Sequence, residues 1–230
     1  MVETRARELF APLGPSYDRY ARLLSFGQDP RWRRFLVSRV PAGPDDVVLD
    51  LATGTGAVAL ELVRQKRCSV VGVDQSPEML AEARRRVATN RVRLVEANAE
   101  ELPFDDESFD GLTAAYLLRY LSDLPSGLKG LARVLRPGAT ASLLDFGVPP
   151  GPAPRTLWNL YVDVGLPTLG RVISPGWHEV GRFLGGSIRE FDERWPVPRL
   201  LTAFREAGFE DVHARRLSLG GCTVFWGRRA

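Results

Sequence analysis

A glycine-rich turn follows a short apolar run in LDLATGTGAVAL, residues 49–60. The spacing Gly54-x-Gly56-x-x-Ala59 fits the dinucleotide fingerprint, in which glycines let the backbone approach a pyrophosphate at a helix N-terminus. Asp50 argues against a pyrophosphate, because a carboxylate at the mouth of the turn repels an anion and attracts an ammonium group. The turn is therefore expected to hold a ligand that carries a positive charge.

A second acid, Asp74, ends the next β-branched run, SVVGVD. A carboxylate at this place can accept hydrogen bonds from both hydroxyls of a ribose, although a helix-capping aspartate would occupy the same place. Asp50 and Asp74 together describe a ligand with a ribose at one end and a cationic amino acid at the other. S-adenosylmethionine is such a ligand.

Short β-branched runs alternate with helical segments through the middle of the chain. Residues 76–78, Ser-Pro-Glu, are typical of a helix start, because they supply a capping oxygen, a proline at the first helical position and an acid near the helix dipole. The alternation predicts an α/β fold with a parallel sheet covered on both faces. Ligands collect at the carboxyl ends of such strands. We expect four loops to meet there, after Asp50, at Asp74, at residues 98–100 and after residue 116.

The composition is that of an ordinary globular protein, with 230 residues of which 44% are hydrophobic and 26% charged. No apolar run approaches the ~20 residues of a membrane-spanning helix, and the N-terminal stretch lacks the apolar core of a secretory signal, so we expect a cytoplasmic protein. Cys68 and Cys222 stand far apart, which indicates neither a disulfide framework nor a metal site. The net charge of +3 permits nucleic acid or anionic lipid as a partner without requiring either.

The chain is expected to fold as one domain over residues 1–230. Residues 1–45 are arginine-rich and are interpreted as a helical lid, and residues 46–147 form the cofactor-binding core. Residues 148–185 interrupt the alternation with prolines, glycines and aromatics, and so long an insertion is usually functional or mobile. We place it on the acceptor side. Residues 186–230 resume with a helix and strands.

Several stretches carry a resemblance to a known family. VVLDLATGTGAVAL, VVGVDQSPEML, VEANAEELPFDDESFD and LARVLRPGA resemble the class I S-adenosylmethionine-dependent methyltransferases, with Ala52 in the first glycine slot of their first motif. SYDRYARLLSFGQDPRWRRFLV, AYLLRYL, FLGGSIREF, AGFEDV and LSLGGCTVFWG are similar to one branch, the ubiquinone/menaquinone biosynthesis methyltransferase family. This resemblance covers nearly the whole chain in the right order.

The resemblance implies a three-layer Rossmann-like methyltransferase fold, with a mostly parallel seven-stranded sheet, an antiparallel edge strand and helices on both faces. It implies C-methylation of a polyprenyl quinol precursor, such as a demethylmenaquinol, with S-adenosylmethionine as cofactor and S-adenosylhomocysteine as product. The partner would be a lipophilic aromatic small molecule. A homodimer is compatible with the sequence, and a nucleic-acid substrate is disfavoured because no motif for a flipped base occurs.

The resemblance also implies the cofactor-binding residues. Asp50 and the backbone of Gly54 and Gly56 would hold the methionine part, and Asp74 the ribose. Asn98 and Ala99 would edge the adenine, with Met79 against its face, although Asn98 could be a turn residue and Met79 plain core. The other residues assigned to cofactor binding are Ala52, Thr53, Gln75 and Ala115.

The catalytic residues implied are fewer, because methyl transfer mainly requires positioning and the exclusion of water. Arg119 would direct a positive charge into the pocket to stabilise an aryl oxyanion, unless it is a surface arginine. Tyr17 and Asp18 would close the N-terminal segment over the cofactor. Asp145 and His178 are weaker candidates for the proton acceptor, and a single histidine in an aromatic insertion is more often structural.

The acceptor side departs from the family. Residues 116–120, Tyr-Leu-Leu-Arg-Tyr, stand where the family shows Phe-Gly-Leu-Arg-Asn, and residues 181–184 also differ. A small-molecule O-, N- or C-methyltransferase of secondary metabolism and a non-catalytic cofactor-binding scaffold are therefore the alternatives. RWRRFLVSRV and LWNLYVDVGL could dock at the inner face of a membrane, or could cover the core.

Overall fold

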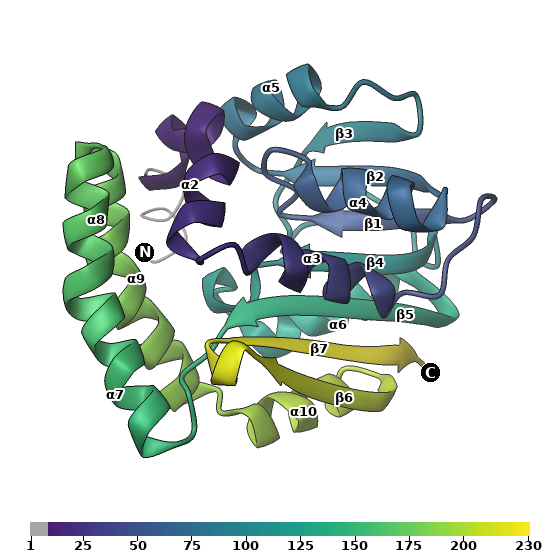
Figure 1. The fold of residues 1–230 in the computed structure, drawn as a ribbon. Helices are drawn as coiled ribbons and strands as arrows, with labels where there is room; N and C mark the ends of the chain where they lie inside the picture. The colour runs from purple at the N-terminus through teal and green to yellow at the C-terminus, as the bar shows by residue number, and fades with distance from the viewer. Residues whose placement is uncertain (1–8) are drawn as a thin grey trace.

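A seven-stranded sheet forms the centre of the molecule, in the order β3-β2-β1-β4-β5-β7-β6 (Figure 1). The computed structural model describes residues 9–230. The strands are β1 (Val47–Leu51), β2 (Ser69–Asp74), β3 (Val92–Glu96), β4 (Phe109–Ala115), β5 (Leu135–Phe146), β6 (Phe209–Leu217) and β7 (Cys222–Arg229). β1 to β5 pair in parallel. β7 runs antiparallel to β5, and the edge strand β6 antiparallel to β7. The mostly parallel sheet is confirmed.

Helices cover both faces of the sheet and one of its ends. In chain order they are η1 (Ala11–Ser16), α2 (Tyr17–Leu24), α3 (Asp29–Ser38), α4 (Ala57–Lys66), α5 (Pro77–Arg86), η2 (Leu118–Tyr120), α6 (Leu124–Val134), α7 (Pro152–Leu160), η3 (Tyr161–Gly165), α8 (Leu166–Ile173), α9 (Pro175–Arg194), α10 (Val197–Glu206) and η4 (Ser218–Gly220). The η3 segment is a single π-helical turn between α7 and α8.

Two apolar clusters hold the helices on the sheet. On one face, Leu128 of α6 and Phe204 of α10 pack on the central strands without solvent exposure. On the other face, Leu36 of α3 and Leu62 of α4 are equally buried. The central strands are apolar on both faces, as expected when helices cover both sides of a parallel sheet. α3 carries RWRRFLVS, so this stretch covers the core.

The remaining helices stand beside the ends of the parallel strands. In Figure 1, α2, α8 and α9 lie on the side to which these strands point. A third apolar cluster joins them, and it includes Leu24 of α2, Leu166 of α8 and Trp177 of α9. This layer faces the edge of the sheet where ligands collect in α/β folds.

The segment expected as an insertion, residues 148–185, is mostly helical. α9 runs without a break from residue 175 to 194, so the division expected at residue 185 falls inside this helix. Glycines in α8 and α9 permit close packing of the two helices. A Cβ on Gly170 of α8 would lie 2.3 Å from the carbonyl oxygen of Trp177, and a Cβ on Gly181 of α9 would lie 2.8 Å from the carbonyl oxygen of Leu166. These glycines let α8 and α9 approach each other.

Candidate active site

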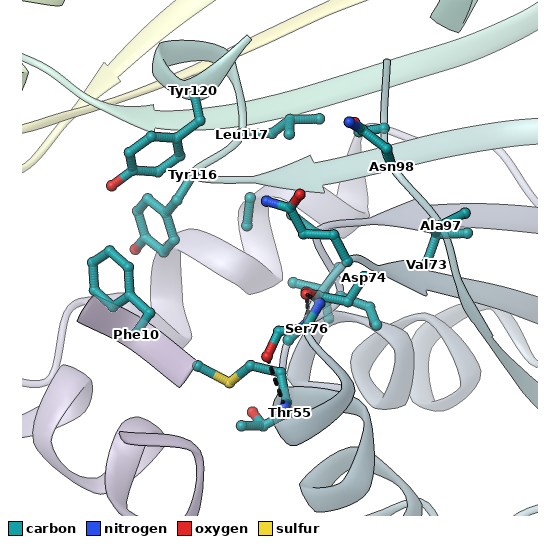
Figure 2. Close-up of a pocket in the computed structure, with 18 of the residues that line it drawn as sticks. Phe10, Thr55, Val73, Asp74, Ser76, Ala97, Asn98, Tyr116, Leu117 and Tyr120 are labelled. Atoms are coloured by element: carbon teal, nitrogen blue, oxygen red, sulfur yellow. Dashed lines mark hydrogen bonds between the residues drawn. The ribbon is translucent and has the colours of Figure 1, made fainter. Parts of the chain in front are cut away.

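A cavity opens at the carboxyl ends of β1, β2 and β4 (Figure 2). It brings together most residues that the sequence assigned to cofactor binding. These are Ala52, Thr53, Gly54, Asp74, Gln75, Met79, Asn98, Ala99 and Ala115. We call it the cofactor cavity.

The glycine-rich turn forms one wall of the cofactor cavity. Ala52, Gly54 and Gly56 all have positive φ angles, of 51°, 56° and 81°. Gly56 is the N-cap of α4, and a Cβ there would lie 2.9 Å from Cγ2 of Val87. This glycine is required by conformation and by space, although it is not in the cavity wall.

The amide of Gly54 donates a hydrogen bond of 2.8 Å to Oδ2 of Asp74, which ties the turn to the end of β2. The other carboxylate oxygen of Asp74 accepts from the amide of Ser76 at 2.9 Å. Ser76 itself caps α5, because its hydroxyl accepts from the amide of Met79 at 3.2 Å. Asp74 is therefore not the cap, and its carboxylate lies in the wall of the cavity.

Asp50 lies beneath the turn and has no solvent exposure. Its carboxylate accepts hydrogen bonds from the hydroxyls of Thr53 at 2.6 Å and Thr113 at 2.7 Å. Burial raises the pKa of Asp50 to about 6, against the lowering effect of these two bonds. The residues that line the cavity do not include Asp50, so Asp50 is placed behind the turn rather than in the cavity wall. Its charge acts from below, through Thr53.

The opposite wall comes from β3, β4 and the segments that follow them. Asn98 lines the cavity, and its Oδ1 accepts from the amide of Glu100 at 2.9 Å, so the side chain also shapes a turn. In Figure 2 the rings of Phe10, Tyr116 and Tyr120 gather at one side of the cavity, away from Asn98. This aromatic side leads to a second cavity.

The second cavity has a volume of about 340 Å³ and an apolar lining. Its walls come from helices α2, α3, α7, α8 and α9, with η3 and η4. They include the apolar side chains of Leu24, Trp32, Phe146, Trp158, Val162, Leu166, Trp177, Val180, Leu184 and Ile188. Four residues line both cavities: Phe10, Tyr17, Tyr116 and Arg119. We call it the acceptor cavity.

Arg119 lies at the junction of the two cavities. Its guanidinium forms a buried ion pair with Asp145 and donates from Nη2 to the hydroxyl of Tyr120 at 3.0 Å. Burial opposes the charge, but Asp145 raises the pKa of Arg119 above its usual value, so the side chain is a permanent cation. Nε has no hydrogen-bond partner among the described residues. A buried donor without a partner at a cavity wall is available to a ligand.

Tyr17 also lies at this junction. Its ring is stacked on Trp177 with 6.0 Å between centroids, and burial raises its pKa to about 12, so the hydroxyl stays protonated. Asp18 is placed differently, because its carboxylate accepts from the hydroxyl of Thr55 and pairs with Arg86. Asp18 thus holds α2 onto the turn and α5, outside both cavities.

His178 is not in either cavity wall. Its Nδ1 donates to the carbonyl oxygen of Pro167 at 2.9 Å, which joins α9 to the start of α8. The structure therefore does not bring His178 to the cavities where an acceptor proton would be taken. Asp145 forms an ion pair with Arg119 and is also outside the walls of both cavities.

Several residues of the cavity walls were not among the predicted site residues. Asp29 and Arg33 lie within the N-terminal stretch that resembles the family, but no local pattern distinguishes them there, and Phe10 lies outside the stretches that carry the resemblance. Tyr116 and Tyr120 flank the predicted Arg119, so that segment could have indicated them. Ser76 was recognised only as a helix start.

The sequence model of the ubiE/COQ5 methyltransferase family matches residues 1–229. The chain belongs to the ubiE/COQ5 methyltransferase family. The ubiquinone/menaquinone biosynthesis C-methyltransferase UbiE of Geobacter sp. (strain M21) is 38% identical, over 98% of this chain and 96% of the relative. The demethylmenaquinone methyltransferase of Thermus thermophilus is 39% identical, over 96% of this chain and 100% of the relative.

Solved structures at lower identity share the fold. The putative methyltransferase bound to the Trm112 activator of Haloferax volcanii has a TM-score of 0.66 at 21% identity, covering 95% of this chain and 96% of that chain. The geranyl diphosphate C-methyltransferase of Streptomyces coelicolor, bound to S-adenosylhomocysteine, has a TM-score of 0.63 at 16% identity, covering 88% and 79%. These confirm the Rossmann-like methyltransferase fold.

This member of the ubiE/COQ5 family is a methyltransferase that uses S-adenosylmethionine. The residues of the cofactor cavity fit that group. A turn of positive φ angles at Ala52 and Gly54 leaves room for a ligand to approach the backbone, Asp74 lies in the wall to accept hydroxyl donors, and the buried charge of Asp50 favours a cation. No pyrophosphate would be favoured between two carboxylates.

Proposed function

We propose that this chain transfers the methyl group of S-adenosylmethionine to a ring carbon of a prenylated quinol of the demethylmenaquinol type, and releases S-adenosylhomocysteine. The observation that carries the proposal is the apolar acceptor cavity, which meets the cofactor cavity at Arg119. An aromatic ring with an apolar tail matches this lining better than a polar acceptor does. The names of the relatives agree with this choice.

The chain supplies position and charge. We assign Asp74 to the ribose, the turn at Gly54 to the methionine part, and Met79, Asn98 and Ala99 to the adenine. The bound cofactor supplies a methyl group activated by a positively charged sulfur. Tyr17 and Trp177 close the junction and exclude water, which favours transfer to the acceptor over side reactions.

Arg119 stabilises the charge that develops on the acceptor. An aryl hydroxyl that loses its proton makes the neighbouring ring carbon nucleophilic, and the guanidinium of Arg119 compensates the negative oxygen. Asp145 fixes this guanidinium in place through the buried ion pair. Asp18 acts at a distance, by holding α2 against Thr55 and Arg86.

We further propose that the chain docks on the inner face of the cytoplasmic membrane, where a prenylated acceptor resides. Within residues 9–230, no helix is long and apolar enough to cross a bilayer. Six of the exposed large apolar side chains of the described residues lie on α2, α7, η3 and α8, namely Leu23, Leu157, Leu160, Val164, Leu169 and Val172. The other two are Phe26, in the turn after α2, and Leu219, in η4. Phe26, Leu157 and Leu219 also line the acceptor cavity, so the acceptor cavity opens on this face.

Charge on the same helices suits an anionic lipid surface. Arg22 of α2, Arg155 of α7 and Arg171 of α8 are exposed beside these apolar side chains. Together they form an amphipathic face of the kind that lies in the headgroup region. LWNLYVDVGL contributes to this face, whereas RWRRFLVS of α3 does not.

The proposal is tested by incubating the chain with methyl-labelled S-adenosylmethionine and a lipid extract from a host that lacks the quinone methyltransferase. We expect label in the quinone fraction. Label in another fraction would identify a different acceptor, and cofactor binding without transfer to any acceptor would indicate a scaffold.

A further inference from the structure

A buried carboxylate and a phenol form a hydrogen-bonded pair in the wall of the acceptor cavity. The hydroxyl of Tyr116 donates to Oδ1 of Asp29 at 2.7 Å, and Oδ2 of Asp29 accepts from Nε of Arg33 at 2.8 Å. Asp29 is only 5% exposed. The two residues lie far apart in the sequence, at the start of α3 and the end of β4. The roles assigned so far do not use this pair.

Tyr116 is held in position by its surroundings. Its ring is stacked on Phe146 with 4.5 Å between centroids, and Cζ of Arg119 lies 5.8 Å from the ring centroid. Its backbone has a φ of 62°, a costly conformation for a bulky residue, and its amide donates to the carbonyl of Leu144 at 2.7 Å. Such strained positions cluster at functional sites.

The hydroxyl of Tyr116 has a defined hydrogen-bonding capacity. Its single donor is used by Asp29, so toward a ligand its oxygen can only accept. Burial raises the pKa of Tyr116 well above its usual value, which keeps this hydroxyl protonated. Tyr116 lines both cavities. A ligand with an aryl hydroxyl at the junction could therefore donate to it.

Asp29 stands out among the carboxylates near the junction. It is the one acidic residue among the described residues that line the acceptor cavity. Asp29 is paired with Arg33 at 2.8 Å, just as Asp18 and Asp145 are paired with Arg86 and Arg119. Asp18 and Asp145, however, are outside both cavity walls, whereas Asp29 lies in one. A proton that leaves an aryl hydroxyl at this junction thus has Asp29 as a carboxylate acceptor one hydrogen bond beyond the Tyr116 hydroxyl.

We propose that Tyr116 accepts a hydrogen bond from the aryl hydroxyl of the methyl acceptor, and that Asp29 takes the proton through the Tyr116 hydroxyl. The inference deepens the proposed function and rests on it for the identity of the acceptor. The aryl O–H bond breaks as its proton moves to the oxygen of Tyr116, and the proton of Tyr116 moves to Asp29. The ring carbon bonds to the methyl group as the methyl–sulfur bond breaks.

The protons then balance. The methylated ring carbon releases its own proton to solvent, which restores the aromatic ring. Asp29 returns the stored proton through Tyr116 to the aryl oxygen. One proton leaves for each methyl group transferred, and the pair ends in its starting state.

A binding experiment tests the recognition step without any turnover. Fluorescence titration compares 1-naphthol with 1-methoxynaphthalene, which cannot donate, in the presence of S-adenosylhomocysteine. We expect the wild type to prefer the naphthol by about fivefold, the contribution of one buried hydrogen bond. Tyr116→Phe, which keeps the stacked ring, should abolish the preference. Tyr20→Phe is the matched control, because Tyr20 lines neither cavity, and it should leave the preference intact. An equal affinity for the two probes in the wild type would overturn the proposal.

Kinetics with the quinol test the proton path. Tyr116→Phe and Asp29→Asn should each lower kcat on the order of a hundredfold. Tyr116→Phe should also raise KM by up to about fivefold, because it loses the hydrogen bond to the acceptor, whereas Asp29→Asn should change KM little. Because the two residues act in series, the double variant should be little worse than either single variant. Losses that multiply, or a Tyr116→Phe variant with more than half of the wild-type kcat, would overturn the path. If the wild type prefers the naphthol but methylates no quinol, the proposed function fails and the recognition by Tyr116 stands.

Discussion

At the residue scale, Asp50 places a buried carboxylate beneath the glycine-rich turn, where we propose that it favours a cationic ligand. Its carboxylate is covered by Thr53 and Thr113, and burial holds its pKa at about 6. A cationic ligand above the turn stabilises the ionised carboxylate and lowers that pKa. Binding near pH 6 must therefore expel part of a proton. At pH 8 the group is already ionised, and no proton is expelled.

Calorimetry in buffers of different ionisation enthalpy measures this proton. We expect S-adenosylhomocysteine, which carries the same ammonium group as the methyl donor, to release a fraction of a proton at pH 6 and close to none at pH 8. Asp50→Asn should abolish this difference in proton release between pH 6 and pH 8. A release that persists in this variant would assign the proton to another group.

Asp74 makes a direct contribution to the cofactor cavity. Asp74→Asn removes the charge and weakens the bond to the amide of Gly54. Since charge-assisted hydrogen bonds contribute about 1.5 to 3 kcal/mol, cofactor affinity should fall about ten- to a hundredfold. The measurement is calorimetric titration. The control is Asp105→Asn, which removes the same charge at an exposed residue and should leave the cofactor affinity unchanged. If Asp105→Asn lost as much affinity as Asp74→Asn, the effect would come from the net charge of the protein and not from the place of Asp74.

The predicted residues that the structure brings into the cavity walls share one property, a place in a short motif. The glycine-rich turn, Asp74, Asn98 and Arg119 each lie at the end of a strand, so their spacing indicates that they meet. Asp29 lies at the start of a helix, and its hydrogen bond to Tyr116 crosses 87 positions of sequence. No local pattern signals such a contact.

At the element scale, the start of α4 depends on Gly56. Its φ of 81° and the proximity of Val87 leave no room for a side chain. Gly56→Ala should therefore lower the free energy of unfolding by about 1 to 2 kcal/mol. Gly130→Ala in α6 is the matched control, because a Cβ there meets nothing within 4 Å, and it should stabilise by about 0.5 to 1 kcal/mol. Urea unfolding measures both, and destabilisation at both glycines would contradict this account.

The helices of residues 152–194 show where sequence patterns failed. Prolines at helix starts and glycines in α8 and α9 are also typical of loops, so the sequence indicates an insertion here without indicating its helices. In the structure, Pro152 and Pro175 lie at the first positions of α7 and α9. Gly170 and Gly181 lie where α8 and α9 touch. The contact between α8 and α9 that requires these glycines is tertiary, so the sequence alone could not distinguish helices from loops in this segment.

At the scale of the whole molecule, the sheet was predictable and the acceptor side was not. The alternation of β-branched runs and helices indicates a parallel sheet, and a sheet of this kind fixes the edge where the cofactor binds. The acceptor cavity is assembled from helices at both ends of the chain, α2 and α3 with α7, α8 and α9. Its shape depends on how these helices pack, which no single segment encodes.

The membrane face belongs to this scale, because it joins several helices. The double variant Leu160→Glu, Val172→Glu places charge on two side chains that are 61% and 83% exposed and outside both cavities. Binding to phosphatidylglycerol vesicles, measured by co-sedimentation, should weaken more than tenfold, since each apolar side chain contributes about 1.5 to 3 kcal/mol when buried. Ala81→Glu on α5, away from this face, should bind like the wild type. Unchanged vesicle binding by the double variant would show that this face is not the membrane-binding surface.

The central claim is that the two cavities bring a methyl donor and a lipophilic quinol together at Arg119. The most direct test is mass spectrometry of the products formed by the purified chain from trideuteromethyl-labelled S-adenosylmethionine and an equal mixture of demethylmenaquinol and water-soluble phenols and amines. The account predicts the label on a ring carbon of the prenylated quinol. A label on oxygen or nitrogen, or on a water-soluble acceptor with the quinol untouched, would contradict it.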